Sequence, residues 1–174
     1  LAIFETPYYH KIIGITDAAI NIDPDLKEKA EIIKNAVFAY NRLGIDSPMV
    51  GILAAIEKIN PKMKATVHAA KLKEMNKTGQ LRNCTIDGPL ALDNAVSRLA
   101  ARHKGIDSDI AGNVDILVTP DINSGNILYK SLNFLGGAVS AALVLGASVP
   151  VILTSRADSD QSKFMSIVFA VAIK

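Results

Sequence analysis

Apolar and polar positions alternate along the chain in blocks that fit strands and helices in turn. Two short runs of β-forming residues, at 1–4 and 11–16, flank a Pro-Tyr-Tyr segment and predict a hairpin or two edge strands. Further blocks are mostly apolar and predict buried strands. These blocks cover residues 50–55, 84–86, 115–119, 141–145 and 151–154.

Segments with apolar residues at helical spacing separate these strands. Asp23-Pro24 predicts the start of the first helix, because Asp accepts hydrogen bonds from free N–H groups and Pro suits a first turn. Gly44 predicts the end of that helix. Thr66 is expected to cap a second helix, which ends at Gly79. The remaining helices are expected over residues 90–103, from 123 or 124 to 135, and 163–173.

This alternation predicts an α/β fold: a mostly parallel sheet with helices on both faces, and a short β excursion near the N-terminus. Ligands of such sheets bind beyond the carboxyl ends of the strands. We therefore expect the chemistry in the strand-to-helix loops, which should all lie at one edge of the sheet. The candidate loops are residues 87–90, 119–126 and 154–160.

Two of these loops have residues suited to an anion. In the loop at 119–126, Asn123, Ser124 and Asn126 stand where a helix begins, and free N–H groups there attract negative charge. The same residues also serve as ordinary helix caps. In the loop at 154–160, Arg156 could bind a phosphate through two parallel hydrogen bonds. Either aspartate of that loop could act as a base or simply cap the last helix.

Composition narrows the possible functions. The chain has 174 residues, enough for one domain, and hydrophobic residues make up 49% of it. A single cysteine, Cys84, excludes an internal disulfide and is expected to be a small core residue. The longest uncharged apolar stretch, 134–153, is broken by Gly, Ser and Pro, so we expect no membrane span. Charged and polar residues from Glu5 to Lys11 also argue against a signal peptide at the start of the sequence.

Charge is unevenly distributed along the chain. The net charge of +2, the absence of Trp and an aromatic content of 5% predict no nucleic-acid binding. Between Glu57 and Arg82, however, the sequence has seven basic residues and only two acidic ones. This basic stretch is either a solvated face or a surface that attracts an anionic ligand.

Several sequence blocks together resemble the phosphate acetyl/butyryltransferase family, in that family's order and spacing and over virtually the whole chain. The blocks are Thr16 to Asn21 with Pro24, Asp87 to Asp93, Pro120 to Asn126 with Tyr129-Lys130, and Ser155-Arg156. The block that starts at Asp87 is more similar to the butyryl branch, because the acetyl branch usually has a glutamine where Ala91 stands.

Members of that family are longer. The resemblance implies that residues 1–174 are the C-terminal region: a second α/β domain plus final elements that pack on a missing N-terminal domain. It also implies a fold like that of isocitrate and isopropylmalate dehydrogenases, with the active site between the domains and some basic residues supplied by the N-terminal part. A cytoplasmic homo-oligomer is expected.

The implied reaction is the reversible transfer of an acyl group, by the branch resemblance butyryl, between coenzyme A and inorganic phosphate. The transfer is direct, in a ternary complex, with the CoA thioester as substrate and no metal or redox cofactor. By analogy, Arg156 binds the phosphoryl group and Ser155 hydrogen-bonds the transition state. Asp160 is the expected base, although an ungapped match places Ser162 where the acetyl branch has its aspartate. The expected substrate-binding residues are Asp87, Gly88, Pro89, Asn123, Ser124, Gly125, Asn126 and Lys130.

Other functions stay open at this point. The acyl group could be acetyl, or it could come from an acyl carrier protein. A metal-dependent decarboxylating dehydrogenase shares the expected fold, but Asp87, Asp121 and Asp158 lack its usual sequence context. A non-catalytic module that binds acyl-CoA or phosphate belongs to a different class altogether.

Overall fold

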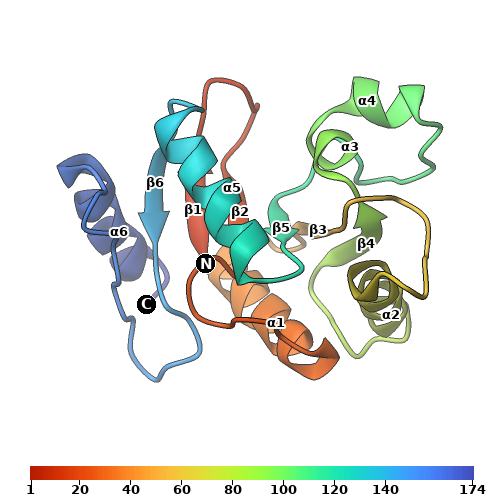
Figure 1. The fold of residues 1–174 in the computed structure, drawn as a ribbon. Coiled ribbons are helices and arrows are strands. Elements are labelled where there is room, and N and C mark those ends of the chain that lie inside the picture. Colours follow the sequence, from red (N-terminus) through yellow and green to blue (C-terminus); the bar gives the residue numbers. More distant parts are fainter.

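A computed structural model describes residues 1–174 and shows a sheet of six strands between two layers of helices (Figure 1). The strands are β1 (Ala2–Glu5), β2 (Ile13–Thr16), β3 (Met49–Leu53), β4 (Thr85–Leu90), β5 (Ile116–Val118) and β6 (Val139–Ala142). Their order in the sheet is β4-β3-β5-β2-β1-β6. The mostly parallel α/β fold expected from the sequence is thus confirmed.

Strand direction places the functional edge of the sheet. β2, β5, β3 and β4 pair in parallel, whereas β1 is antiparallel to both β2 and β6. Every strand except β1 therefore ends at the same edge, and the chain begins there too. The predicted hairpin of β1 and β2 is confirmed, but neither strand is an edge strand, because β6 and β5 flank the pair.

Six helices cover the sheet (Figure 1). They are α1 (Leu26–Arg42), α2 (Lys64–Lys77), α3 (Leu92–Val96), α4 (Arg98–His103), α5 (Ile122–Phe134) and α6 (Asp160–Ala172). α1, α2 and α6 pack on one face, and α3 and α5 pack on the other. Alternate residues of the central strands supply the two cores: Ile116 and Val118 point to the first face, and Leu117 points to the second.

Tyr40 shows how tightly α1 sits on the sheet. Its ring is fully buried, and its hydroxyl donates to the carbonyl oxygen of Asp115 at 2.8 Å. A Cβ on Gly14 would lie 2.8 Å from that hydroxyl, so only glycine fits opposite the ring in β2. Burying one such aromatic side chain stabilises the fold by about 2 kcal/mol.

Several helix starts differ from the sequence prediction. α1 is capped by Asp25 rather than Asp23, because Asp25 and Glu28 form a reciprocal capping box. α2 begins after Met63, and the Thr66 hydroxyl lies inside its first turn, where it donates to the Met63 carbonyl. The helix expected over 90–103 is broken into α3 and α4 by the extended backbone of Ser97, which caps α4.

Two strand predictions are corrected as well. The strand expected to end at Ile86 continues to Leu90, so Asp87, Gly88 and Pro89 belong to β4 and are not a loop. The strand expected over 151–154 is absent; only Val151 forms an isolated bridge, with Val144. None of the helices combines the length and apolar character that a bilayer crossing requires.

Candidate functional site at the carboxyl edge of the sheet

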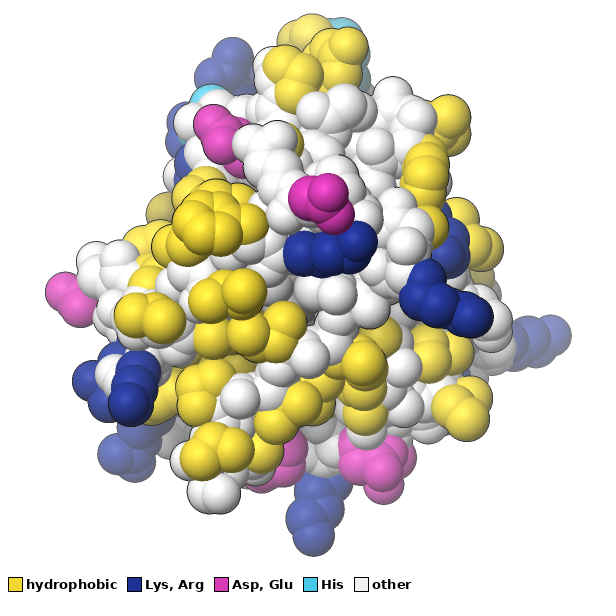
Figure 2. Space-filling model, turned by 90° about the vertical axis from the view of Figure 1, so that its left-hand side faces the viewer, with side chains coloured by type: hydrophobic (Ala, Val, Ile, Leu, Met, Phe, Trp, Pro, Cys, Tyr) yellow, Lys and Arg dark blue, Asp and Glu magenta, His cyan; other side chains and the backbone are white.

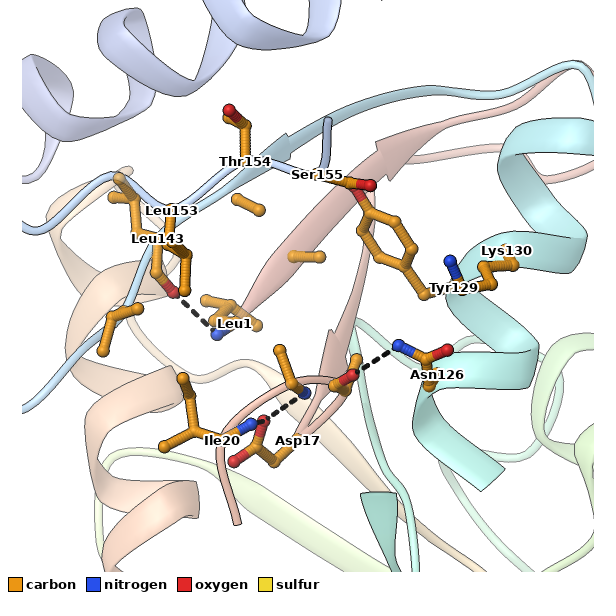
Figure 3. A pocket seen from close by; sticks show the side chains of 15 residues that line it. Leu1, Asp17, Ile20, Asn126, Tyr129, Lys130, Leu143, Leu153, Thr154 and Ser155 are labelled. Atoms are coloured by element: carbon orange, nitrogen blue, oxygen red, sulfur yellow. Dashed lines mark hydrogen bonds between the residues drawn. The ribbon is translucent and has the colours of Figure 1, made fainter. Parts of the chain in front are cut away.

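A pocket lies at the carboxyl edge, beside the ends of β2 and β6 (Figure 3). Its volume is about 270 Å³. Three segments form its walls: the loop after β2, the helix α5, and the chain between β6 and α6. The lining residues are Leu1, Ala2, Asp17, Ala18, Ala19, Ile20, Asn126, Tyr129, Lys130, Ala142, Leu143, Val144, Leu153, Thr154 and Ser155.

Asp17 shapes the wall that follows β2. Its carboxylate accepts from the backbone N–H groups of Ala19, Ile20 and Asn21 and from the Asn21 side chain, at 2.5–3.1 Å. Burial of the carboxylate raises its pKa, but these hydrogen bonds outweigh burial, and the pKa of Asp17 lies below its usual value. Asp17 therefore holds the loop together as a charged carboxylate, with both oxygens accepting hydrogen bonds from the loop.

The start of α5 forms the second wall. Asp121 caps the helix by accepting from the Ser124 N–H at 2.9 Å and from its hydroxyl at 3.1 Å. A Cβ on Gly125 would collide with the carbonyl oxygen of Asp17, so glycine lets the helix approach the loop. The Asn126 side chain donates to the Ala18 carbonyl at 3.2 Å. The polar residues of this turn thus join the two walls.

The outer side chains of α5 have fewer partners. Lys130 is exposed at the rim of the pocket (Figure 3). Asn123 is exposed on the first turn. Lys130 carries the one cationic side chain that lines the pocket.

A tight turn at Ser155 forms the third wall. The Asp158 carboxylate accepts from the Ser155 N–H at 2.7 Å and from the Tyr129 hydroxyl at 3.0 Å. Ser155 lines the pocket, and Arg156 follows it as an exposed side chain. Asp160 lies at the start of α6, fully exposed and paired with Lys163 at 3.3 Å.

The predicted substrate-binding residues of β4 lie elsewhere. β4 is one edge of the sheet and four strands separate it from β6. Asp87 forms an ion pair with Lys73 of α2, and Gly88 and Pro89 are buried. The structure therefore brings the loops at 119–126 and 154–160 together at one pocket and leaves the 87–90 segment outside its lining.

Asp17 and Tyr129 are pocket residues that sequence reasoning quoted in motifs without giving them a role. The signal was present in their positions, one directly after a strand and one a turn beyond the polar start of α5. The apolar walls from Leu143 and Leu153 had no such signal, because the segment between β6 and α6 is irregular.

The basic stretch of the sequence lies mostly on α2. Lys73 pairs with Asp87, and Lys64 pairs with Asp23 at 2.9 Å. Cys84 is half-buried, and burial raises its pKa to about 11, so the thiol is protonated near neutral pH. No group of three or more His, Cys, Asp or Glu side chains comes together in this chain.

Comparisons with known proteins show what this chain is similar to. Residues 1–171 match the family described as "Phosphate acetyl/butaryl transferase". A "Probable phosphate butyryltransferase" of Bacillus subtilis is 50% identical over 171 residues, 98% of this chain and 57% of that protein. A phosphate acetyltransferase of Thermotoga maritima is 48% identical over 167 residues, with 96% and 57% covered.

A solved structure is also similar. The crystal structure of a branched-chain phosphotransacylase from Enterococcus faecalis superposes with a TM-score of 0.90 and 41% identity. The superposition covers 99% of this chain and 61% of that one. The chain thus spans somewhat over half the length of these relatives.

Proposed function

Since the chain belongs to the phosphate acetyl/butyryltransferase family, we propose that it carries part of an active site that transfers an acyl group reversibly between coenzyme A and inorganic phosphate. The observation that carries the proposal is the turn at Ser155-Arg156 beside a largely apolar pocket. An apolar wall suits an acyl chain, and an arginine next to it suits a phosphate group.

The chemistry assigns each group a task. In the direction from acyl phosphate, the CoA sulfur attacks the carbonyl carbon, and the bond from that carbon to the phosphate oxygen breaks. The thiol must first lose its proton, because its pKa is about 8.5 in water. Arg156 would stabilise the leaving phosphate, and the Ser155 hydroxyl would donate to the tetrahedral oxyanion. Lys130 at the rim would add positive charge.

Asp160 is the carboxylate that we propose as the base. The alternative, Asp158, already holds the Ser155 N–H and the Tyr129 hydroxyl with one oxygen. Asp160 is exposed, and its partner is a surface lysine. Asp160→Asn should slow the acylation of CoA. Ser162→Ala, at the position where the acetyl branch has its aspartate, should not slow it.

Butyryl is the acyl group that we propose. The family includes relatives named for acetyl and for butyryl transfer, so the name alone does not decide. The pocket of about 270 Å³ has room beyond an acetyl group, and small side chains at Ala18, Ala19 and Ala142 create that room. Replacing Ala142 by Leu should lower turnover of butyryl-CoA more than that of acetyl-CoA. Equal losses for both would remove the size argument.

The proposed domain arrangement follows from the exposed apolar surface. Figure 2 shows hydrophobic side chains gathered on the face that carries α6 and β6. On α6, Phe164, Ile167 and Val171 are each more than half exposed. We propose that an additional N-terminal domain, of the kind that lengthens the family's members, covers this apolar α6 face. The dehydrogenase-like likeness, homo-oligomer formation and a cytoplasmic location stay predictions.

Product analysis tests the proposed reaction. Phosphorus NMR of butyryl-CoA and phosphate, incubated with the longest natural polypeptide that contains these residues, should show an acyl phosphate signal. The same experiment also tests the alternative of a non-catalytic module that binds acyl-CoA or phosphate. Calorimetric binding of CoA without any acyl phosphate would support that module and overturn the enzyme.

A further inference from the structure

A single hydrogen bond joins the turn at residues 152–158 to another element of the fold. It runs from the Tyr129 hydroxyl on α5 to Oδ2 of Asp158, at 3.0 Å. The other hydrogen bonds of the turn are internal: Ser155 N–H to Asp158, Asp158 N–H to the Ser155 carbonyl, and Ala157 N–H to the Ser155 hydroxyl. Between the Val144–Val151 bridge and the start of α6, the Tyr129 phenol therefore supplies the hydrogen bond that ties this turn to another element.

Tyr129 is itself held in place by the core. Its ring packs edge-on against Phe4, with centroids 5.4 Å apart and an interplanar angle of 69°. Phe4 is fully buried in the second core, under α5. Because two aromatic rings in this geometry restrict each other, the hydroxyl of Tyr129 has a fixed position above the sheet.

Asp158 transmits that position to the turn. One of its oxygens accepts both the Tyr129 hydroxyl and the Ser155 N–H. Burial raises the pKa of Tyr129, so the phenol is a donor and not an anion at neutral pH. Hydrogen bonds to a charged carboxylate are stronger than those between neutral groups. The contact thus links the aromatic core directly to the backbone of Ser155.

We propose that Tyr129 is a positioning residue, which acts through Asp158 to hold Ser155 and Arg156 at the rim of the pocket. The inference rests on the proposed function, because Ser155 and Arg156 are its phosphate-handling groups. Tyr129 need not touch the reacting atoms. Its contribution is orientation, and small displacements of catalytic groups are costly to turnover.

The test is a double-variant cycle on the longest natural polypeptide that contains the chain. Tyr129→Phe keeps the ring against Phe4 and removes only the donor. We expect kcat to fall about tenfold to a hundredfold and KM for phosphate to rise, with KM for acyl-CoA within about twofold. Asp158→Ala should have a similar effect. The double variant should be no more than about twofold worse than the poorer single variant, because both changes break one link.

Tyr8→Phe is the matched control, since Tyr8 is 84% exposed and remote from the pocket lining. It should leave kcat and both KM values unchanged. Asp158→Asn, which keeps an acceptor oxygen, should recover part of the activity that Asp158→Ala loses. A purely structural role of Tyr129 would lower the melting temperature without this recovery or the non-additive cycle.

The outcomes separate the two proposals. An active wild type in which Tyr129→Phe has normal kinetics, or in which the two losses multiply, would overturn the positioning role alone. A wild type that forms no acyl phosphate would overturn the proposed function first.

Discussion

Arg156 is exposed and takes part in no ion pair of the chain. Replacing it with alanine should therefore leave the fold unchanged, because surface substitutions shift stability by about 0.5 kcal/mol or less. Activity should nevertheless fall about a hundredfold or more, by loss of charge stabilisation at the phosphate. Steady-state kinetics with varied phosphate, beside a thermal melt, would measure both.

Arg102→Ala supplies a control for Arg156→Ala, since Arg102 is also exposed but lies on α4, outside the pocket lining. It should retain normal kinetics. If Arg156→Ala keeps the phosphate dependence of the wild type, the assigned role of this arginine is wrong.

Cys84 offers a second prediction at the scale of one residue. Because burial raises its pKa to about 11, almost no thiolate exists at neutral pH. Cys84→Ala should keep turnover, and iodoacetamide should modify the folded protein far more slowly than the unfolded one. Loss of turnover in a folded Cys84→Ala variant would point to a covalent acyl-cysteine route instead.

The sequence motifs named some of the residues that line the pocket and missed others. Of the site residues that the resemblance implied, Ser155, Asn126 and Lys130 line the pocket, whereas the 87–90 segment, Arg156 and Asp160 do not. Tyr129 was not assigned, because its task depends on Asp158, which is 29 residues further along the chain. A contact over such a separation leaves no trace in local periodicity.

The loop after β2 is the element whose stability depends most clearly on pH. Hydrogen bonds to Asp17 overcome the effect of burial and hold its pKa below the usual value. The unfolded chain therefore takes up a proton more readily at this group. The resulting stabilisation is fully present above the unfolded-state pKa, near 4, and is lost as the pH falls through the lower folded-state value.

Urea unfolding followed from about pH 7 down to about pH 2, a range that spans the unfolded-state pKa near 4, would test this prediction. Asp17→Asn should lower the free energy of unfolding at pH 7, and its stability should change less with acid than that of the wild type. Asp46→Asn is a control at an exposed carboxylate in the segment between α1 and β3. An equal acid sensitivity of the wild type and Asp17→Asn would contradict the assignment.

Elements were predictable in kind, and their ends less so. The apolar blocks gave β3 and β5 within one or two residues. Helix starts shifted wherever neighbouring residues competed to cap, as Asp25 did with Asp23. Residues 151–154 are as apolar as a strand, yet they have no neighbouring strand to pair with beyond the Val144 bridge. Strand formation needs a partner, which a local pattern does not specify.

For the whole molecule, the order of the strands was beyond local patterns. The insertion of β1 between β2 and β6 depends on pairings between residues 2–5 and 139–142, far apart in the sequence. That insertion brings the start of the chain, the end of β6 and α5 around one pocket. The site thus exists only once the sheet is complete.

The apolar α6 face gives a prediction about the additional N-terminal domain that we propose. In a Cys84→Ala background, Val171→Cys should react quickly with a thiol reagent in the 174-residue chain, because Val171 is 71% exposed. The same cysteine should be protected in the longest natural polypeptide. Lys77→Cys, exposed at the end of α2, should react in both and serves as the control. Equal reactivity of Val171→Cys in both forms would rule out an N-terminal domain on this face.

The most direct test of the central claim is phosphate-dependent release of free thiol from butyryl-CoA, with acetyl-CoA in parallel. It should be measured on the 174-residue chain and on the longest natural polypeptide that contains it. We predict fast release by the longer form only, strictly dependent on phosphate and faster with butyryl-CoA. An absence of phosphate-dependent release from either thioester by the longer form would contradict acyl transfer at this pocket.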